Sequence, residues 1–257
     1  MTLSVIVNTL NEERNIAACL DLATWADEIV VVDMQSDDRT VEIARQYTDK
    51  VFLHERSGYV EPARNYAMKQ AKGDWLLILD ADERITPALR AELEAVTANP
   101  GEMVAFRIPI RDYMFGRWVR HGNWKYQKLI RLVKRGIGRW SGAVHQQMQV
   151  DGQIGTLANP LDHYSHTTIA RFLAKMNTYT SVEAHERFTA GERATPAGAV
   201  IHAGVQFMKE YGVYQGFRDG GHGIALAGLM AAYVFSTRIK LWEIAYKAKR
   251  GIPYDDV

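Results

Sequence analysis

The chain has 257 residues, of which 47% are hydrophobic and 24% are charged, and its formal net charge at pH 7 is +1. This composition is typical of a globular protein, and the nearly balanced charge argues against a dedicated nucleic-acid binder. The single cysteine, Cys19, excludes an internal disulfide framework and favours a reducing compartment. The length suits one α/β domain, alone or with an appended segment.

The N-terminal residues show no basic segment followed by a long apolar run, so we expect no signal peptide and a cytoplasmic location. No uninterrupted apolar run reaches about 18 residues, the length that usually marks a membrane-spanning helix. The sequence therefore predicts no spanning helix.

Short apolar runs alternate with helical patterns in residues 3–79. We predict strands at 3–7, 28–33, 51–53 and 75–79, and helices at 13–22, 40–47 and 62–72. We expect Asn11 to cap the first helix. The alternation predicts a parallel, doubly wound α/β sheet, in which ligands bind beyond the carboxyl ends of the strands.

Polar side chains gather at those carboxyl ends. They follow the first, second and fourth predicted strands, in that order: Thr9, Asn11 and Glu12, then Asp33, then Asp80 and Asp82. Taken singly, each is an ordinary turn or helix-capping residue. At equivalent ends of successive strands, they predict one shared site.

The fourth strand ends in a pair of carboxylates, Asp80 and Asp82. In extended chain, residues at i and i+2 point to the same side, where two carboxylates repel each other unless a cation lies between them. Mg²⁺ is usually held by one or two carboxylates together with substrate phosphates. The pair therefore predicts a metal–diphosphate site, and the alternative is an exposed acidic turn before the next helix.

Beyond Gly101 the pattern changes. Residues 104–110 and 128–133 predict further strands, and the chain is helical in pattern from Ile169 onward. We therefore expect an α/β domain at 1–166 and a helical extension at 167–257.

Three segments after the predicted strands form an ordered set: residues 8–13, 32–38 and 79–82. This set resembles glycosyltransferase family 2, whose members are inverting enzymes with the GT-A fold. Four segments of the second half are similar to the branch that contains the lipopolysaccharide-core β-glucosyltransferases: residues 128–132, 142–145, 163–164 and 216–220. The resemblance covers nearly the whole chain and implies that 1–166 is the nucleotide-sugar-binding and catalytic domain.

The resemblance also implies roles for individual residues. The nucleotide-sugar donor would contact Thr9, Asn11, Glu12, Asp33, Arg64, Asp80 and Arg131. Of these, Asp33 would hydrogen-bond the base, typically uracil, and Asp80 would face the ribose and the metal. Asp82 would act in catalysis as a ligand of Mg²⁺ or Mn²⁺, with His163 as a third ligand. Two rival interpretations remain: a packing role for His163 and a solvated strand position for Arg131.

An inverting transfer needs a general base on the acceptor hydroxyl. Many relatives have His-Glu where this chain has His145-Gln146, and a glutamine cannot take a proton. We predict that His145 is the base. The alternative is a structural or diphosphate-binding role for His145.

The C-terminal segment joins an uncharged stretch, residues 223–235, to basic and aromatic residues. These are Arg238, Lys240, Trp242, Tyr246, Lys247, Lys249 and Arg250. Such a segment fits peripheral attachment to an anionic membrane surface, which Phe207, Met208 and Tyr211 would extend. The alternative is a terminal helix pair that packs on the catalytic domain.

The resemblance, together with these patterns, implies an inverting, metal-dependent enzyme on the inner face of the cytoplasmic membrane. It would move a hexose, glucose from UDP-glucose, onto a lipid-linked glycan such as a lipopolysaccharide inner core, with no nucleic-acid partner. Alternatives are transfer to polyprenyl phosphate or to a capsule or exopolysaccharide precursor, a nucleotidyltransferase, and a non-catalytic GT-A scaffold. The nucleotidyltransferase would be expected to carry a Gly-rich loop after the first strand, and residues 8–13 contain no glycine.

Overall fold

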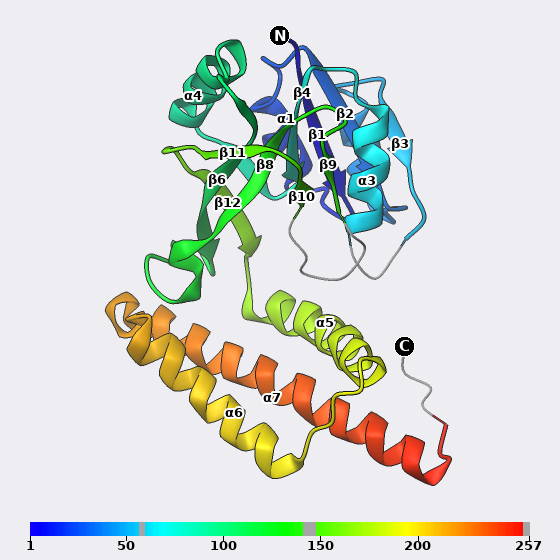
Figure 1. Ribbon diagram of the computed structural model, residues 1–257, viewed down its shortest axis with the longest axis vertical. Helices are drawn as coiled ribbons and strands as arrows, with labels where there is room; N and C mark the ends of the chain where they lie inside the picture. The colour runs from blue at the N-terminus through cyan, green and yellow to red at the C-terminus, as the bar shows by residue number, and fades with distance from the viewer. Residues whose placement is uncertain (57–59, 141–147, 254–257) are drawn as a thin grey trace. The chain divides into compact units, whose positions relative to one another are not determined.

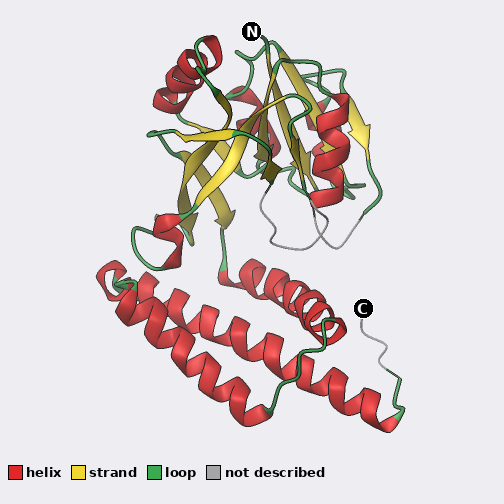
Figure 2. Cartoon of the chain, viewed as in Figure 1, coloured by secondary structure: helices red, strands yellow, loops and turns green. Residues whose placement is uncertain are grey.

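The computed structural model describes residues 1–56, 60–140 and 148–253 (Figure 1). The chain divides into two compact units. The first unit is Met1–Asp112 with Tyr126–Ser165, and the second is Tyr113–Lys125 with His166–Val257. Residues 113–125, which we expected in the N-terminal domain, therefore belong to the second unit. Figure 2 shows that most strands lie in the first unit and that the second is mainly helical.

The first unit is built on a mixed sheet whose strand order is β3-β2-β1-β4-β8-β6-β12-β5, with β11 beside β6. Its strands are β1 (Leu3–Thr9), β2 (Glu28–Asp33), β3 (Val51–Leu53), β4 (Trp75–Asp80), β5 (Glu83–Ile85), β6 (Met103–Met114), β8 (Lys128–Lys134), β11 (Gln153–Thr156) and β12 (Leu161–His166). The first four strands are parallel to one another, and β8 runs antiparallel to both β4 and β6. Two short strands, β9 (Gly138–Arg139) and β10 (Gln149–Val150), pair separately.

Helices cover both faces of the sheet. They are α1 (Ile16–Asp21), α2 (Thr40–Ala44), α3 (Glu61–Gln70) and α4 (Pro87–Ala98). Alternate strand residues enter two separate apolar cores, because successive side chains of a strand point to opposite faces. One core joins the strands to α1, α2 and α4, and the other joins them to α3. Ala63, Ala67 and Ala71, which are spaced four residues apart, are buried against the sheet.

The strand order reverses at β1, which lies between β2 and β4. The register places Thr9 beside Asp33 and Asn8 beside Asp80. The three strands that carry the predicted polar residues therefore end at the same edge, at the switch point of the sheet. This confirms the doubly wound arrangement predicted for residues 3–79.

The predicted start of the first helix is wrong. Helix α1 begins at Ile16, and its N-cap position is Asn15. Asn11 instead adopts a left-handed conformation with φ of 55°, which asparagine tolerates better than most residues. Its side-chain oxygen accepts a hydrogen bond from the backbone N–H of Asp37 at 2.8 Å. Asn11 thus links the loops that follow β1 and β2.

The second unit is a bundle of long helices. Its elements are β7 (Arg117–Trp118), η1 (Asn123–Tyr126), α5 (Ile169–Thr189), α6 (Pro196–Met208), the π-helical turn η2 (Lys209–Val213), η3 (Gly216–Asp219) and α7 (Gly221–Arg250). Thr168 and Thr195 cap α5 and α6 through their hydroxyl oxygens. Helix α7 packs along both α5 and α6 (Figure 1).

By length and composition alone, α7 could cross a membrane: its best window has a mean hydropathy of 1.4, and 22% of that window is buried. The core helix of a soluble protein passes the same test, so this finding is weak evidence. The sequence predicted no such helix because the uncharged stretch within α7 is short. Helix α6 exposes large apolar side chains along its length, namely Val200, Ile201, Val205 and Met208.

Candidate functional site

Two arginines converge on Asp80 at the end of β4. Arg64, from α3, donates to both oxygens of Asp80 at 2.6 and 2.7 Å. Arg131, from β8, donates to Asp80 Oδ2 at 2.8 Å. The Arg64 guanidinium also lies 5.4 Å from the ring centre of Trp140, a cation–π distance. Two cations from separate elements therefore lie beside the carboxylate that ends the strand.

Glu83 completes this charged group. Its side chain is fully buried, one oxygen forms an ion pair with Arg131, and the other accepts the backbone N–H of Asp80 at 2.9 Å. Removing a charge from water is costly unless a partner compensates it. Arg131, itself 4% exposed, supplies that compensation and is not the solvated strand arginine of the rival interpretation.

Burial and charge act in opposite directions on the pKa values of this group. Burial tends to raise the pKa of Asp80, but Arg64 and Arg131 outweigh it and hold that pKa well below its usual range. Burial raises the pKa of Glu83, and Arg131 only partly opposes this. Burial tends to lower the pKa of Arg131, but Glu83 and Asp80 outweigh burial and raise that pKa above its ordinary value. Asp80 and Arg131 are accordingly charged at neutral pH.

Asp82 has different partners, because β4 ends at Asp80 and the chain turns before β5 begins. Strand β12 pairs antiparallel with β5 and brings His163 opposite Glu83. His163 Nε2 lies 3.5 Å from Asp82 Oδ1, and His163 Nδ1 lies 2.7 Å from Asp112 Oδ1. Asp112 is buried, and its other oxygen has no hydrogen-bond partner among the residues that the structure describes. Asp82, His163 and Asp112 thus form a carboxylate–imidazole–carboxylate chain.

This chain fits a divalent ion. A histidine that ligates a metal usually places its other ring nitrogen on a carboxylate, as Asp112 does here. Asp82 and His163 would then provide one oxygen and one nitrogen ligand, which leaves positions for diphosphate oxygens and water. No group of three or more His, Cys, Asp or Glu side chains with metal-binding geometry occurs in the residues that the structure describes. The two Asp80 oxygens already accept hydrogen bonds from arginines.

The loops after β1 and β2 are joined through Ser36. Ser36 donates from both its backbone N–H and its hydroxyl to Asp33, and its hydroxyl oxygen accepts the N–H of Asn11 at 2.8 Å. Glu12 accepts from the side chain of Asn15 at 2.6 Å. The hydroxyl of Thr9 is buried and has no hydrogen-bond partner within the described part of the chain. Two of the predicted nucleoside residues, Asn11 and Asp33, are therefore linked through Ser36 at the switch point.

The structure brings together most of the residues predicted from the sequence. It joins Arg64, Asp80 and Arg131 in one cluster and Asp82 and His163 in another. His145 and Gln146 lie outside the described residues. Sequence reasoning missed the roles of Glu83 and Asp112, whose burial depends on β8, β12 and β6 and leaves no local signal.

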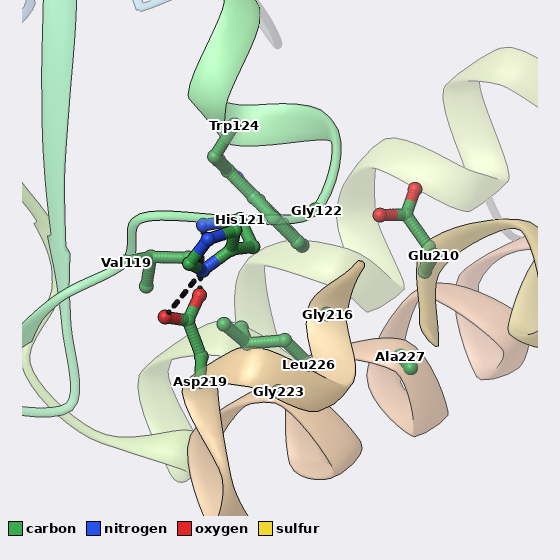
Figure 3. Close-up of a pocket in the computed structure, with 10 residues that line it drawn as sticks. All are labelled: Val119, His121, Gly122, Trp124, Glu210, Gly216, Asp219, Gly223, Leu226 and Ala227. Atoms are coloured by element: carbon green, nitrogen blue, oxygen red, sulfur yellow. Dashed lines mark hydrogen bonds and ion pairs between the residues drawn. The ribbon is translucent and has the colours of Figure 1, made fainter. Parts of the chain in front are cut away.

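A second polar cluster lies in the second unit (Figure 3). Asp219 accepts the backbone N–H groups of Arg120 and His121 at 3.1 and 2.8 Å, and His121 Nδ1 lies 3.0 Å from its other oxygen. Glu210 accepts the N–H of Asn123 at 3.0 Å. The cavity between them is about 10 Å³, room for at most one water molecule. The cluster therefore anchors the loop 119–124 and does not hold a substrate.

Known proteins are similar to this chain in sequence and in fold. The model of the family "Glycosyl transferase family 2" matches residues 4–149. The chain is 28% identical to the lipopolysaccharide core biosynthesis glycosyltransferase LpsC of Rhizobium meliloti, over 98% of this chain and 96% of that protein. It is 27% identical to an uncharacterized glycosyltransferase of Rickettsia typhi, over 99% of this chain and 91% of that protein.

A solved structure has a similar fold. The mannosyltransferase PcManGT of Pyrobaculum calidifontis, in complex with GDP-Man and Mn²⁺, superposes with a TM-score of 0.54 at 18% identity, over 94% of this chain and 87% of that one. The likeness confirms the expected GT-A fold. The family match over residues 4–149 makes this chain a member of glycosyl transferase family 2.

Proposed function

We propose that this glycosyltransferase moves glucose from UDP-glucose onto a lipid-linked glycan such as a lipopolysaccharide inner core, with inversion at the anomeric carbon. The observation behind the donor assignment is the meeting of Arg64, Arg131, Asp82 and His163 at the edge where β1 and β4 end. The acceptor assignment is supported by the similarity to LpsC over nearly the whole of both chains.

In this proposal the arginines bind the donor diphosphate. A guanidinium suits bidentate contact with phosphate oxygens, and a cation beside the departing diphosphate stabilises the charge that it gathers. Asp80 and Glu83 hold the two arginines in place before the donor arrives. Asp80 also faces the ribose, so this carboxylate links nucleoside recognition to the diphosphate contacts.

Asp82 and His163 would hold Mg²⁺ or Mn²⁺, with Asp112 fixing the orientation of the His163 ring. A bound divalent ion supplies Lewis-acid stabilisation of the leaving nucleoside diphosphate. The complex of PcManGT, which shares the fold, contains Mn²⁺. Asp80 would join the ligands by exchanging one of its arginine contacts.

The nucleoside would lie against the joined loops. Thr9 has a buried hydroxyl free to bond a ligand, Asn11 and Glu12 frame the same surface, and Asp33 would accept from the uracil N–H. A carboxylate has about four acceptor positions, so Asp33 can keep its two bonds to Ser36 and accept another.

His145 is our proposed general base. It would take the proton of the acceptor hydroxyl as that oxygen attacks the anomeric carbon and the bond to the diphosphate breaks. Gln146 cannot serve in this role, which leaves His145 as the candidate in the segment where relatives carry His-Glu.

We place the protein at the inner face of the cytoplasmic membrane, bound through the helical second unit. The exposed apolar side chains of α6 and the basic last turn of α7 support this placement. A lipid-linked acceptor would be presented at that surface.

A donor screen tests the function. UDP release would be measured with UDP-sugars and purified lipopolysaccharide-core acceptors, with polyprenyl phosphate and capsule precursors as rival acceptors. We expect release with UDP-glucose that depends on the core acceptor and is lost in Asp82→Asn. UDP release that depends on another acceptor would contradict the proposed lipopolysaccharide-core acceptor. No UDP release with any donor would favour the non-catalytic scaffold.

A further inference from the structure

A cavity of about 250 Å³ lies among the three long helices of the second unit. Each helix contributes polar side chains from one face, because residues three, four or seven positions apart share a face of a helix. They are Glu183 and Arg187 of α5, His202 and Lys209 at α6 and its end, and Tyr233 and Thr237 of α7, with the adjacent Arg238. The cavity lies entirely within one compact unit.

The cavity has a surplus of positive charge. Glu183 is the only carboxylate among its described lining residues, and it already has partners. Arg187 donates to Glu183 Oε1 at 3.0 and 2.7 Å, and the hydroxyl of Tyr233 donates to Oε2 at 2.8 Å. One arginine is therefore paired with the carboxylate of the lining, and the remaining cations have no carboxylate partner among the described lining residues.

Lys209 and Arg238 are those remaining cations, and His202 is a further donor. Within the described residues none of the three side chains has a hydrogen bond or an ion pair; Lys209 Nζ lies 5.5 Å from the ring centre of Tyr214 and interacts electrostatically with Glu210. Like charges lining one cavity repel each other, and an anion between them removes that repulsion. Guanidinium and ammonium groups together suit the several oxygens of a phosphate.

An apolar surface adjoins the cavity. Val205 lines it and is 59% exposed, and on the same helix Ile201 and Met208 are 65% and 63% exposed. A phosphate held by Lys209 and Arg238 would thus have exposed apolar side chains beside it. That combination matches a ligand with a charged head and an apolar chain.

We infer that this cavity binds the phosphate headgroup of an amphiphile, whose apolar chain lies along α6. The cavity volume suits a phosphate group with part of its alcohol, and is below the range of cavities that enclose drug-sized ligands. The inference rests on the proposed function in one respect, since a lipid-linked acceptor would bring such a headgroup to this unit.

The test compares two double variants of the full chain that remove the same charge. Lys209→Gln with Arg238→Gln alters the cavity, and Arg171→Gln with Lys175→Gln alters two exposed positions of α5, outside the lining. Binding would be measured to phosphatidylcholine vesicles with and without phosphatidic acid, and to glycerol phosphate in solution. No sugar donor is present, so failure here is distinct from failure of the glycosyltransferase proposal.

We expect the cavity variant to bind phosphatidic acid vesicles at least about tenfold more weakly than the wild type, and the control variant to change less than about twofold. Equal losses of vesicle binding in both variants, or no loss in the cavity variant, would overturn the proposal that the cavity binds the phosphate. Glycerol phosphate should bind more weakly than the vesicles. Equal affinity per phosphate would show that the apolar chain does not contribute to binding and would overturn the proposed amphiphilic ligand. Thermal unfolding of each variant checks its fold, and the exposed Lys209→Gln single variant repeats the test if the double variant unfolds.

Discussion

The guanidinium of Arg131 lies 2.8 Å from a carboxylate oxygen of Asp80, although 51 positions separate the two residues in the chain. The same nitrogen pairs with the buried Glu83. Strand β8 therefore fixes the charged end of β4 through a single side chain. The donor site proposed here depends on this contact between strands that are adjacent in the sheet and remote in sequence.

Removing Arg131 should destabilise the fold strongly. Arg131→Met leaves Glu83 buried without its cation, and we expect unfolding free energy to fall by about 3–5 kcal/mol. Adding Glu83→Gln should restore part of that loss, because the uncompensated charge is then gone. Urea unfolding measures both effects. Arg139→Met, at an exposed position, serves as the control. If Arg131→Met lowers the unfolding free energy as little as Arg139→Met does, the buried pair of Arg131 and Glu83 does not hold the strand end.

Asp112 should act on the site through His163. In Asp112→Asn a neutral amide, which can present either its oxygen or its NH2 to His163 Nδ1, replaces the carboxylate, so the ring orientation toward Asp82 is less firmly fixed. We expect Mn²⁺-dependent UDP affinity to fall by about 10–100-fold, with thermal stability less affected. Nitrogen chemical shifts of His163 should show the changed protonation of the ring. The exposed Asp49→Asn should leave both readouts unchanged; if it matches Asp112→Asn, Asp112 has no positioning role.

Glu28 should make stability depend on pH. Burial tends to raise its pKa, but Lys50, the backbone N–H of Lys72 and the hydroxyl of Ser4 outweigh it and lower the pKa below its ordinary value of 4.5. A lowered folded pKa means that this stability is present above 4.5 and is lost as pH falls through the folded value. Glu28→Gln should therefore cost about 1–3 kcal/mol at neutral pH and little in acid.

The comparison for Glu28 is Glu42→Gln, which alters an exposed ion pair with Arg39. Stability of this control should follow the wild type across the pH range. A Glu28→Gln deficit of equal size at neutral and acidic pH would contradict the ionic origin of the effect.

Replacing either of two glycines of α7 by alanine should change the stability of the protein, in opposite directions. A Cβ on Gly223 would lie 1.8 Å from the carbonyl oxygen of Gly216, so Gly223→Ala must force η3 away from α7. A Cβ on Gly228 meets no atom within 4 Å among the described residues, so Gly228→Ala should stabilise the helix by up to about 1 kcal/mol. Thermal unfolding distinguishes them, and a stabilised Gly223→Ala would show that the close approach is absent.

The sequence predicted the parallel half of the fold because its strands are short apolar runs that end in polar residues. The ends of β1, β2 and β4 meet where the alternation required, and Asp80 and Asp82 lie there. The antiparallel half was harder to predict. Residues 113–125 pack with the helical unit through Asp219 and Glu210, two buried acids whose partners are backbone N–H groups that no sequence pattern marks.

The structure also changes the meaning of the i, i+2 spacing of Asp80 and Asp82. The spacing suggested two carboxylates on one side of a strand, but the chain turns after Asp80, which binds arginines, while Asp82 lies by His163. The basic side chains that pair with Asp80 and Asp82 come from β8, α3 and β12. Periodicity predicted β8 and α3, but neither β12 nor the side chains that these elements bring to Asp80 and Asp82.

The most direct test of the proposed donor site is calorimetric titration of UDP into the wild type and Asp82→Asn, each with Mn²⁺ and with a chelator. The account predicts that Mn²⁺ tightens UDP binding to the wild type by at least about tenfold and has little effect on Asp82→Asn. UDP affinity that is the same with and without Mn²⁺ in the wild type, and unchanged in Asp82→Asn, would contradict a metal–diphosphate site at Asp82.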